Sequence, residues 1–224
     1  MLFPTPVGVA ESLIQMERDG RLWTGLGRSM LRLGKGYALS IVLGVPLGIW
    51  VARVPFLERA VKPVVLGLQA LPSVCWLPLA ILWFGLTEAS ILFVVVMGSL
   101  LAIAIATEDA VRRIEPLLLR EAGTLGVRGL RLYAGVLLPG ALPGILTGLK
   151  LGWSFAWRAL MAAELIVVSG GLGQLLHYGR ELLDVAQVVA VMFSIVAVGV
   201  TVDRVLFRAI ETRVWRRWGL SETR

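Results

Sequence analysis

The chain has 224 residues, of which 57% are hydrophobic and only 17% are charged, and its formal net charge is +7. A soluble domain is about 45–50% apolar and about 25% charged. Because long uncharged runs also recur along this chain, a soluble globular protein, a disordered chain and a secreted disulfide scaffold are all excluded. One cysteine and one histidine exclude an intrachain disulfide and leave no basis for a metal site.

Residues 1–30 are predicted to form an amphipathic tail. Val7, Ala10, Leu13 and Ile14 recur at near-helical spacing, which is typical of a helix that lies flat at the membrane interface. A basic start followed by an apolar core is absent, so no cleavable signal peptide is expected.

Five apolar segments follow, at about 33–54, 61–85, 89–107, 139–167 and 185–207. A helix needs about 20 apolar residues to cross a hydrocarbon core that is about 30 Å thick. The runs are continuous rather than alternating, which excludes a β-barrel. We therefore predict an all-α, polytopic membrane protein, with a transmembrane domain over 31–218 and a short tail at 219–224.

The charges between these segments predict the topology. Loop 108–138 carries Arg112, Arg113, Arg120, Arg128 and Arg131, and five more arginines lie between 208 and 224. Cation-rich loops face the cytoplasm, so this loop and the C-terminus are expected inside and, with five spans, the N-terminus outside. The positive net charge has the same explanation, and no nucleic-acid partner is expected.

Two prolines interrupt the second segment, within the stretch Ala70–Pro78. Pro72 and Pro78 each remove a backbone donor and kink or break a helix, and the freed carbonyls need partners from other helices or from water. Two interpretations remain open. The stretch is either an adaptation to packing or an irregular segment that lines a translocation path, with Ser73 and Trp76 on that path.

The cytoplasmic loop contains a short predicted helix from Pro116 to Gly126. Proline suits a first helical position, and glycine suits the left-handed residue that ends a helix. Leu118, Ala122 and Leu125 fall on one stripe. A helix of about two turns is not stable alone in water, so it needs a surface, either the membrane interface or a partner protein.

The fourth segment carries ionisable side chains within the membrane. On a helical projection, one arc of about 140° holds Trp153, Glu164, Trp157, Lys150, Ser154, Thr147 and Arg158. The opposite side carries small residues such as Gly148 and Gly152, which permit close helix packing. Charges inside a span face protein or water rather than lipid, so the arc predicts a polar interior that forms a translocation pathway.

Alternative roles for these charges remain open. Lys150 lies near the cytoplasmic end, where its ammonium group could snorkel to the interface. Arg158 and Glu164 could pair with other helices only to hold the bundle together. In the functional alternative, Arg158 faces the cavity near the middle of the span and attracts an anion.

Several blocks resemble the bacterial ABC importer permeases. Glu121-Ala122, Gly126 and Leu138-Pro139 resemble the EAA loop of that family. The blocks 76–85, 141–150, 162–165 and 171–173 resemble its nitrate, sulfonate and taurine branch. The resemblance covers about residues 30–218, and the blocks come in the same order.

The resemblance implies a type I importer permease in the bacterial cytoplasmic (inner) membrane. It implies a homodimer, two ATP-binding subunits that receive the loop helix as a coupling helix, and an extracytoplasmic solute-binding protein. The solute would be a small anion or zwitterion of the nitrate, bicarbonate, taurine or sulfonate type. The residues expected to couple to the ATPase are Leu118, Arg120, Glu121, Ala122, Leu125, Gly126 and Pro139.

The chain lacks the phosphate loop G-x-x-x-x-G-K-[ST]. It is therefore expected to bind no cofactor and to catalyse no reaction, with ATP and Mg²⁺ bound by the partner subunits. Two departures from the family pattern stand out. Arg120 occupies the place of the usual glutamate, six residues before the glycine, with Glu121 one residue nearer. Family members also commonly carry one more N-terminal membrane helix.

Two other function classes compete with a permease. A membrane enzyme would need a nucleophile and base, or a metal set, at membrane depth, and one histidine and one cysteine supply neither. A structural or assembly subunit without its own pathway is the main alternative. The polar arc of the fourth segment argues against it, because a pure scaffold has no need of buried charge.

Overall fold

The computed structural model describes residues 4–167 and 169–217, which form a bundle of helices. In chain order, the elements are α1 (Pro6–Arg18), α2 (Arg21–Arg53), α3 (Pro55–Ala70), the 3₁₀ turn η1 (Ser73–Trp76), α4 (Leu77–Phe84), α5 (Glu88–Arg112), α6 (Pro116–Thr124), α7 (Leu130–Leu132), the π-helical segment η2 (Tyr133–Leu137), α8 (Leu138–Ile166), α9 (Leu172–Glu181), α10 (Val185–Thr201), the π-helical segment η3 (Val202–Phe207) and α11 (Arg208–Arg217). The described residues contain no strand. The all-α prediction is confirmed.

Within the described residues, four helices are long and apolar enough to cross a membrane, namely Arg21–Arg53, Glu88–Arg112, Tyr133–Ile166 and Val185–Val214. A fifth candidate is a bent pair, Lys62–Ala70 and Ser73–Phe84, whose halves meet at 96°. Each of the five predicted segments therefore has a helical counterpart. The first helix begins much earlier than expected, at Arg21 rather than near residue 33.

The core is built around α5, which contacts α2 and α8 most extensively. Glycines on α2 and α8 allow these close approaches, because a larger residue at those positions would collide with α5. A Cβ atom on Gly152 of α8 would lie 2.5 Å from Ile103 Cγ1, and one on Gly148 would overlap Ala106. On α2, Gly48 meets α5 in the same way. The small face expected on the fourth span thus packs against α5.

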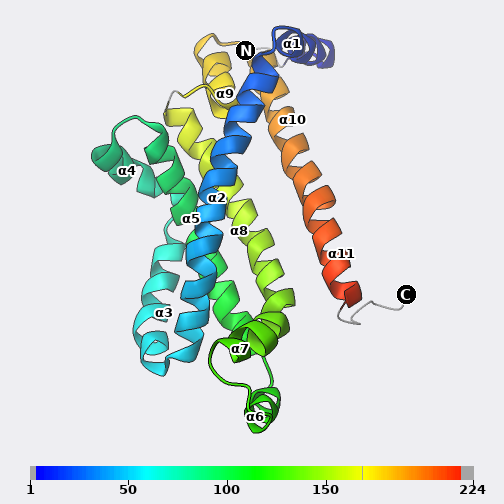
Figure 1. Ribbon diagram of the computed structural model, residues 1–224. Coiled ribbons are helices and arrows are strands. Elements are labelled where there is room, and N and C mark those ends of the chain that lie inside the picture. The colour runs from blue at the N-terminus through cyan, green and yellow to red at the C-terminus, as the bar shows by residue number, and fades with distance from the viewer. Residues whose placement is uncertain (1–3, 168, 218–224) are drawn as a thin grey trace.

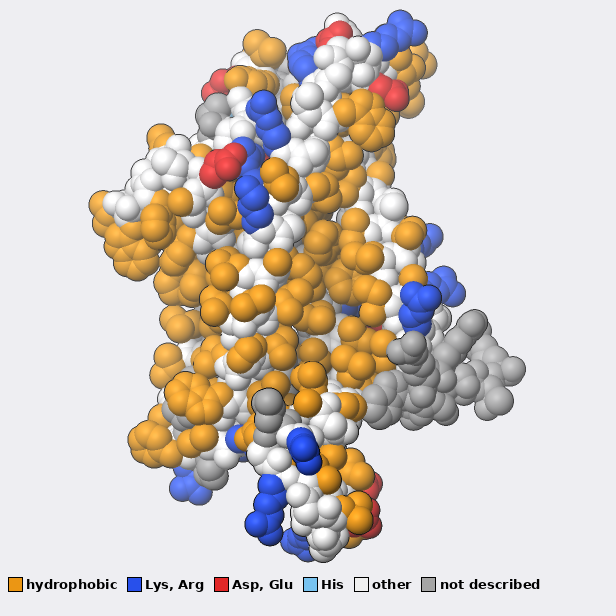
Figure 2. Space-filling view, in the orientation of Figure 1, with side chains coloured by type: hydrophobic (Ala, Val, Ile, Leu, Met, Phe, Trp, Pro, Cys, Tyr) orange, Lys and Arg blue, Asp and Glu red, His pale blue; other side chains and the backbone are white. Residues whose placement is uncertain are grey.

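The two ends of the bundle differ in their short helices (Figure 1). Helices α1 and α9 lie at one end, and α6 protrudes at the other, the end that α11 approaches. Figure 2 shows apolar side chains over the middle of the visible face and charged side chains toward both ends. This arrangement places the long axis of the bundle across a membrane.

Helix α1 confirms part of the predicted amphipathic tail. The Thr5 hydroxyl accepts a hydrogen bond from the Gly8 N–H (3.2 Å) and caps the helix. Met16 is buried, and α1 packs across α10. The residues from Arg21 onward belong to α2, so no structural break lies near residue 30.

The last long helix, formed by α10, η3 and α11, moves away from the bundle toward its C-terminal end. Its first part, α10, packs against α9 and α1, whereas η3 and α11 diverge from α8 (Figure 1). Lys150 of α8 bridges the gap through ion pairs with Asp203 (3.4 Å) and Glu211 (3.7 Å). The rings of Trp153 and Phe207 lie 6.0 Å apart beside these pairs.

Candidate functional site

A polar cavity lies where the broken span meets α5 and α8. Its volume is about 210 Å³, and it is lined by Leu68, Gln69, Leu71, Pro72, Ser73, Met97, Gly98, Leu101, Phe155 and Arg158. Proline breaks the helix between α3 and η1, as expected, and the 96° bend brings Gln69 and Ser73 to the cavity. The irregular segment at Ala70–Pro78 is therefore confirmed as a break in the helix.

Gly98 of α5 makes this cavity possible by its small size. A Cβ atom there would lie 2.9 Å from Ala159 Cβ and 3.2 Å from Ser73 Cβ. Both distances are too short for ordinary packing, so the absence of a side chain lets the bend and α8 approach α5 together. Without that approach, Ser73 and Arg158 would not line the same space.

Among the described residues, Arg158 is the only ionisable one in the lining of this cavity. Its Nε atom donates to the Ser154 carbonyl oxygen (3.1 Å), and its guanidinium lies 4.7 Å from the centroid of the Phe155 ring. The side chain is exposed and forms no ion pair with any described side chain. An arginine at the centre of a span costs about 2.5–3.5 kcal/mol when it faces lipid. This face of α8 must therefore meet water or another protein.

The structure divides the seven residues expected on the polar arc of α8. Thr147, Ser154 and Arg158 are exposed on one half of the arc. The other half, with Trp153, Glu164, Trp157 and Lys150, is covered by other elements of the same chain. The expectation of one continuous polar surface is therefore wrong. A helical projection shows which residues share a side of the helix, but it does not show which other helices cover that side.

The covered residues make different contacts. Trp157 is buried, and its Nε1 atom would lie 3.4 Å from a Cβ atom at Gly199 of α10. Lys150 pairs with Asp203 and Glu211 instead of snorkelling freely. Trp76, expected on the path through the broken span, forms a T-shaped ring contact with Phe93, with 6.5 Å between the ring centroids. None of the three lines the cavity at Arg158.

Glu164 belongs to a buried polar cluster near the α9 end of the bundle. Its carboxylate accepts hydrogen bonds from Arg32 Nη1 (3.0 Å), the Ser29 hydroxyl (2.7 Å) and the Gly173 N–H (3.1 Å). The Glu164 side chain has no exposed surface and that of Arg32 is 5% exposed. The buried charges of Glu164 and Arg32 neutralise each other and are hydrogen-bonded. The cluster therefore joins α2 to α8 and α9 and does not expose charge to a pathway.

Arg32 also reaches the first residue of α5. Its Nη2 atom lies 2.8 Å from Glu88 Oε1, and its Nη1 atom donates to the Ser169 hydroxyl (3.0 Å). Sequence reasoning missed this cluster. The available signals were Ser29 and Arg32 at helical spacing and the glycines after Ser169. A Cβ atom on Gly171 would collide with the Glu164 carboxylate.

A second buried carboxylate, also missed, lies toward the opposite end. Glu108 of α5 is 2% exposed and pairs with Lys62 of α3 (2.7 Å) and with Arg112 (2.7 Å). Lys62 also lies 3.4 Å from Asp109. These pairs fasten the first half of the broken span to α5, below the cavity.

Helix α6 confirms the predicted loop helix. Pro116 lies in its first turn, and Gly126 adopts the left-handed conformation (φ 75°) that ends it. Ala122 is buried, so it is not part of the exposed apolar surface predicted for this helix. Leu118 is 44% and Leu125 81% exposed.

The rest of the expected coupling surface is also accessible. Arg120, Glu121 and Gly126 are exposed, as is Leu117, which sequence reasoning missed. Pro139 is half-buried in the first turn of α8. Exposed leucines at the tip of a protruding helix form an apolar surface with no partner within the described chain.

Comparison with known proteins identifies the family. The model of the family "Binding-protein-dependent transport system inner membrane component" matches residues 44–216. The chain is 33% identical over 217 residues to the putative aliphatic sulfonates transport permease protein SsuC of Escherichia coli, covering 97% of this chain and 82% of that protein. It is 29% identical over 219 residues to the taurine transport system permease protein TauC of Escherichia coli, covering 96% and 79%.

A third relative and a solved structure agree with this result. The bicarbonate transport system permease protein CmpB of Synechocystis is 30% identical over 187 residues, covering 83% of this chain and 66% of that protein. The fold matches a chain of the MetNI methionine ABC transporter in inward-facing conformations, with a TM-score of 0.73 and 21% identity over 88% of this chain and 95% of that one. The resemblance seen in the sequence is confirmed, and the chain belongs to the family of binding-protein-dependent inner membrane transport components, as a permease subunit of the ABC importer type rather than an enzyme.

Proposed function

We propose that this permease passes a small anionic or zwitterionic solute, of the nitrate, bicarbonate, taurine or sulfonate type, across the cytoplasmic membrane. The observation that carries the proposal is Arg158, an exposed cation on a membrane-spanning helix, without an acidic partner among the described side chains and beside a polar cavity. The solutes named for the relatives, aliphatic sulfonates, taurine and bicarbonate, all carry an oxyanion group. A guanidinium group binds such groups through charge-assisted hydrogen bonds.

The proposal includes a second copy of the chain. Arg158 and Ser154 lie on a face of α8 that no described helix covers, and lipid is an unfavourable neighbour for the charge. A second permease copy facing this surface across a water-filled gap would cover it. The gap would then be the translocation pathway, with Gln69, Ser73 and Arg158 on its wall.

Helix α6 is the proposed docking element for the ATP-binding subunits. In the proposed pair of permease copies, each α6 would dock one of two such subunits, which would bind ATP and Mg²⁺. Leu117, Leu118 and Leu125 would enter an apolar groove of the partner, with Arg120 and Glu121 beside it. The α6 end would face the cytoplasm together with the C-terminus. The α1 end would lie outside, where a solute-binding protein delivers its cargo.

A structural or assembly subunit without a pathway is the second candidate. It would need the protrusion of α6 but not an exposed cation beside a cavity within the span. The two candidates therefore differ in the expected effect of changing Arg158, and a single experiment on the complete importer separates them.

The experiment compares two variants by two measurements on the importer complex in proteoliposomes. Arg158→Gln should lower ATP-driven uptake of taurine, ethanesulfonate, bicarbonate or nitrate about tenfold or more, because an ion pair at reduced dielectric is worth more than about 1.4 kcal/mol. It should leave co-purification of the ATP-binding subunit unchanged. Leu125→Asp should release the ATP-binding subunit on purification, and ATP-driven uptake should be lost with it.

Two matched controls accompany these variants. Arg158→Lys keeps the charge and should retain more uptake than Arg158→Gln. Leu182→Asp changes a leucine that is 74% exposed in the turn after α9, at the opposite end from α6, and should not release the ATP-binding subunit. Normal uptake by Arg158→Gln would favour the scaffold interpretation, and full co-purification with Leu125→Asp would remove the docking role of α6.

A further inference from the structure

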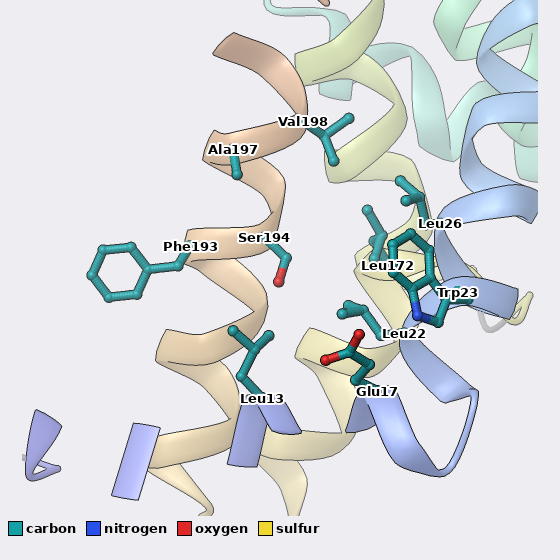
Figure 3. Close-up of a pocket in the computed structure, with 10 residues that line it drawn as sticks. All are labelled: Leu13, Glu17, Leu22, Trp23, Leu26, Leu172, Phe193, Ser194, Ala197 and Val198. Carbon is teal, nitrogen blue, oxygen red and sulfur yellow. The ribbon is translucent and has the colours of Figure 1, made fainter. Parts of the chain in front are cut away.

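A second cavity lies on another side of the bundle, between α1, α2, α9 and α10 (Figure 3). Its volume is about 330 Å³, and it is lined by Leu13, Glu17, Leu22, Trp23, Leu26, Leu172, Phe193, Ser194, Ala197 and Val198. Apart from Glu17 and Ser194, every lining side chain is apolar. The cavity shares no residue with the one at Arg158.

The residues that line this cavity extend from a charged edge toward the apolar middle of α10. Figure 3 shows Leu13 and Glu17, from α1, at one end, and Ala197 and Val198, from α10, at the other. Helix α10 belongs to the apolar stretch Val185–Val214, so its far end lies among acyl chains. The Glu17 end lies near the exposed ion pair between Asp19 and Arg21 (2.7 Å).

The mouth of the cavity has the side chains that are typical of a membrane interface. Trp23 is 59% exposed on one side, and Phe193 is 64% exposed on the other. Tryptophan is enriched at the level of lipid head groups, where its ring is half in the apolar phase. The cavity is therefore open to the bilayer rather than to the interior of the bundle.

We propose that this cavity binds one acyl chain of a phospholipid whose head group carries an ammonium group, with the ammonium beside Glu17. The apolar lining gives a polar solute no hydrogen-bonding partners except Ser194 and Glu17. A carboxylate at the mouth attracts an ammonium and repels a head group that carries only negative charge. The volume of about 330 Å³ is too small for a second protein helix, which is about 10 Å across with its side chains.

The bound lipid would stabilise the docking of α1. Helix α1 is held to the bundle by Met16, which is buried, and by Leu13, which packs on the main core. An acyl chain between α1 and α10 would extend that contact along α10. Loss of the lipid should therefore lower the thermal unfolding midpoint of the purified importer.

The test is native mass spectrometry of the delipidated importer complex after addition of phosphatidylethanolamine or phosphatidylglycerol with identical acyl chains. The unchanged protein should retain phosphatidylethanolamine in preference to phosphatidylglycerol. Ala197→Phe fills the cavity and should abolish this retention. Val196→Phe, on the neighbouring residue that is 60% exposed but does not line the cavity, should retain the lipid as the unchanged protein does.

A second variant keeps the test decisive if filling the cavity also disturbs folding. Glu17 is exposed, so Glu17→Gln should leave the fold intact and reduce the preference for phosphatidylethanolamine about two- to fivefold. The site would be refuted if Ala197→Phe retained phosphatidylethanolamine as well as the unchanged protein does. It would also be refuted if Val196→Phe lost the lipid to the same extent as Ala197→Phe. A preference for phosphatidylglycerol in the unchanged protein would refute the role of Glu17.

Discussion

Arg158 and Glu164 lie on the same helix, six residues apart, yet their surroundings are opposite. The separation is about 9 Å along the axis and about 120° around it. Glu164 is completely buried and accepts hydrogen bonds from Arg32, Ser29 and Gly173. Arg158 is exposed, and its contacts among the described residues are with its own helix, the Ser154 carbonyl oxygen and the Phe155 ring.

The difference separates a charge that holds the bundle from a charge that is free to act. Both carboxylate oxygens of Glu164 accept hydrogen bonds from other parts of the same chain, and the side chain has no exposed surface, so a solute cannot reach it. Arg158 keeps most of its donors unused beside a cavity. A charge in a membrane span therefore indicates function only when the chain itself leaves it uncompensated.

Removal of the buried carboxylate should have the largest effect on stability. Glu164→Ala leaves Arg32 buried without its main partner, and breaking one side of a buried pair costs about 3–5 kcal/mol. The thermal unfolding midpoint of the purified importer in detergent measures this loss. Arg158→Ala, at the exposed site, should change stability by only about 0.5 kcal/mol.

A double variant distinguishes the lost pair from the lost side-chain volume. Arg32→Met combined with Glu164→Leu removes both charges and keeps apolar volume, so most of the stability should return. If Glu164→Ala unfolds at the same temperature as the unchanged protein, the cluster is not what joins α2 to α8.

Local physical chemistry made much of the fold predictable. The apolar lengths predicted five segments, and each has a helical counterpart. Pro116 and Gly126 predicted both ends of α6, since proline suits a first turn and glycine the left-handed residue that follows the last one. Pro72 predicted the break in the second segment. In each case the signal lies within the segment itself.

The partners of the charges could not be predicted in the same way. Glu164 meets Arg32 across 132 residues of sequence, and no local pattern joins them. The helical projection of α8 grouped Glu164 with Arg158, but packing by α2, α9 and α10 covers only one half of that arc. The 96° bend of the second segment likewise depends on contacts between distant elements, such as the close approach of Ser73 to Gly98 of α5.

A smaller effect is expected from a methyl group placed against the buried carboxylate. At Gly171 the backbone has φ −93°, which any residue adopts, so Gly171→Ala tests only the collision with Glu164. Overpacking of this kind costs about 1–3 kcal/mol, and the same unfolding measurement detects it. Gly27→Ala, where nothing lies within 4 Å, should be neutral or slightly stabilising. An equal midpoint for both variants would contradict tight packing at the cluster.

The smallest effect is expected at the exposed end of the same cluster. Glu88 and Glu164 both bind Arg32, but the Glu88 side chain is 62% exposed. Glu88→Gln leaves Arg32 neutralised by Glu164, so it should cost only about 0–1 kcal/mol, and the difference should shrink as salt screens the exposed pair. Unfolding midpoints at low and high salt measure this. A loss as large as that of Glu164→Ala would mean that the position of Glu88 at the start of α5, rather than the burial of a carboxylate, decides the strength of the cluster.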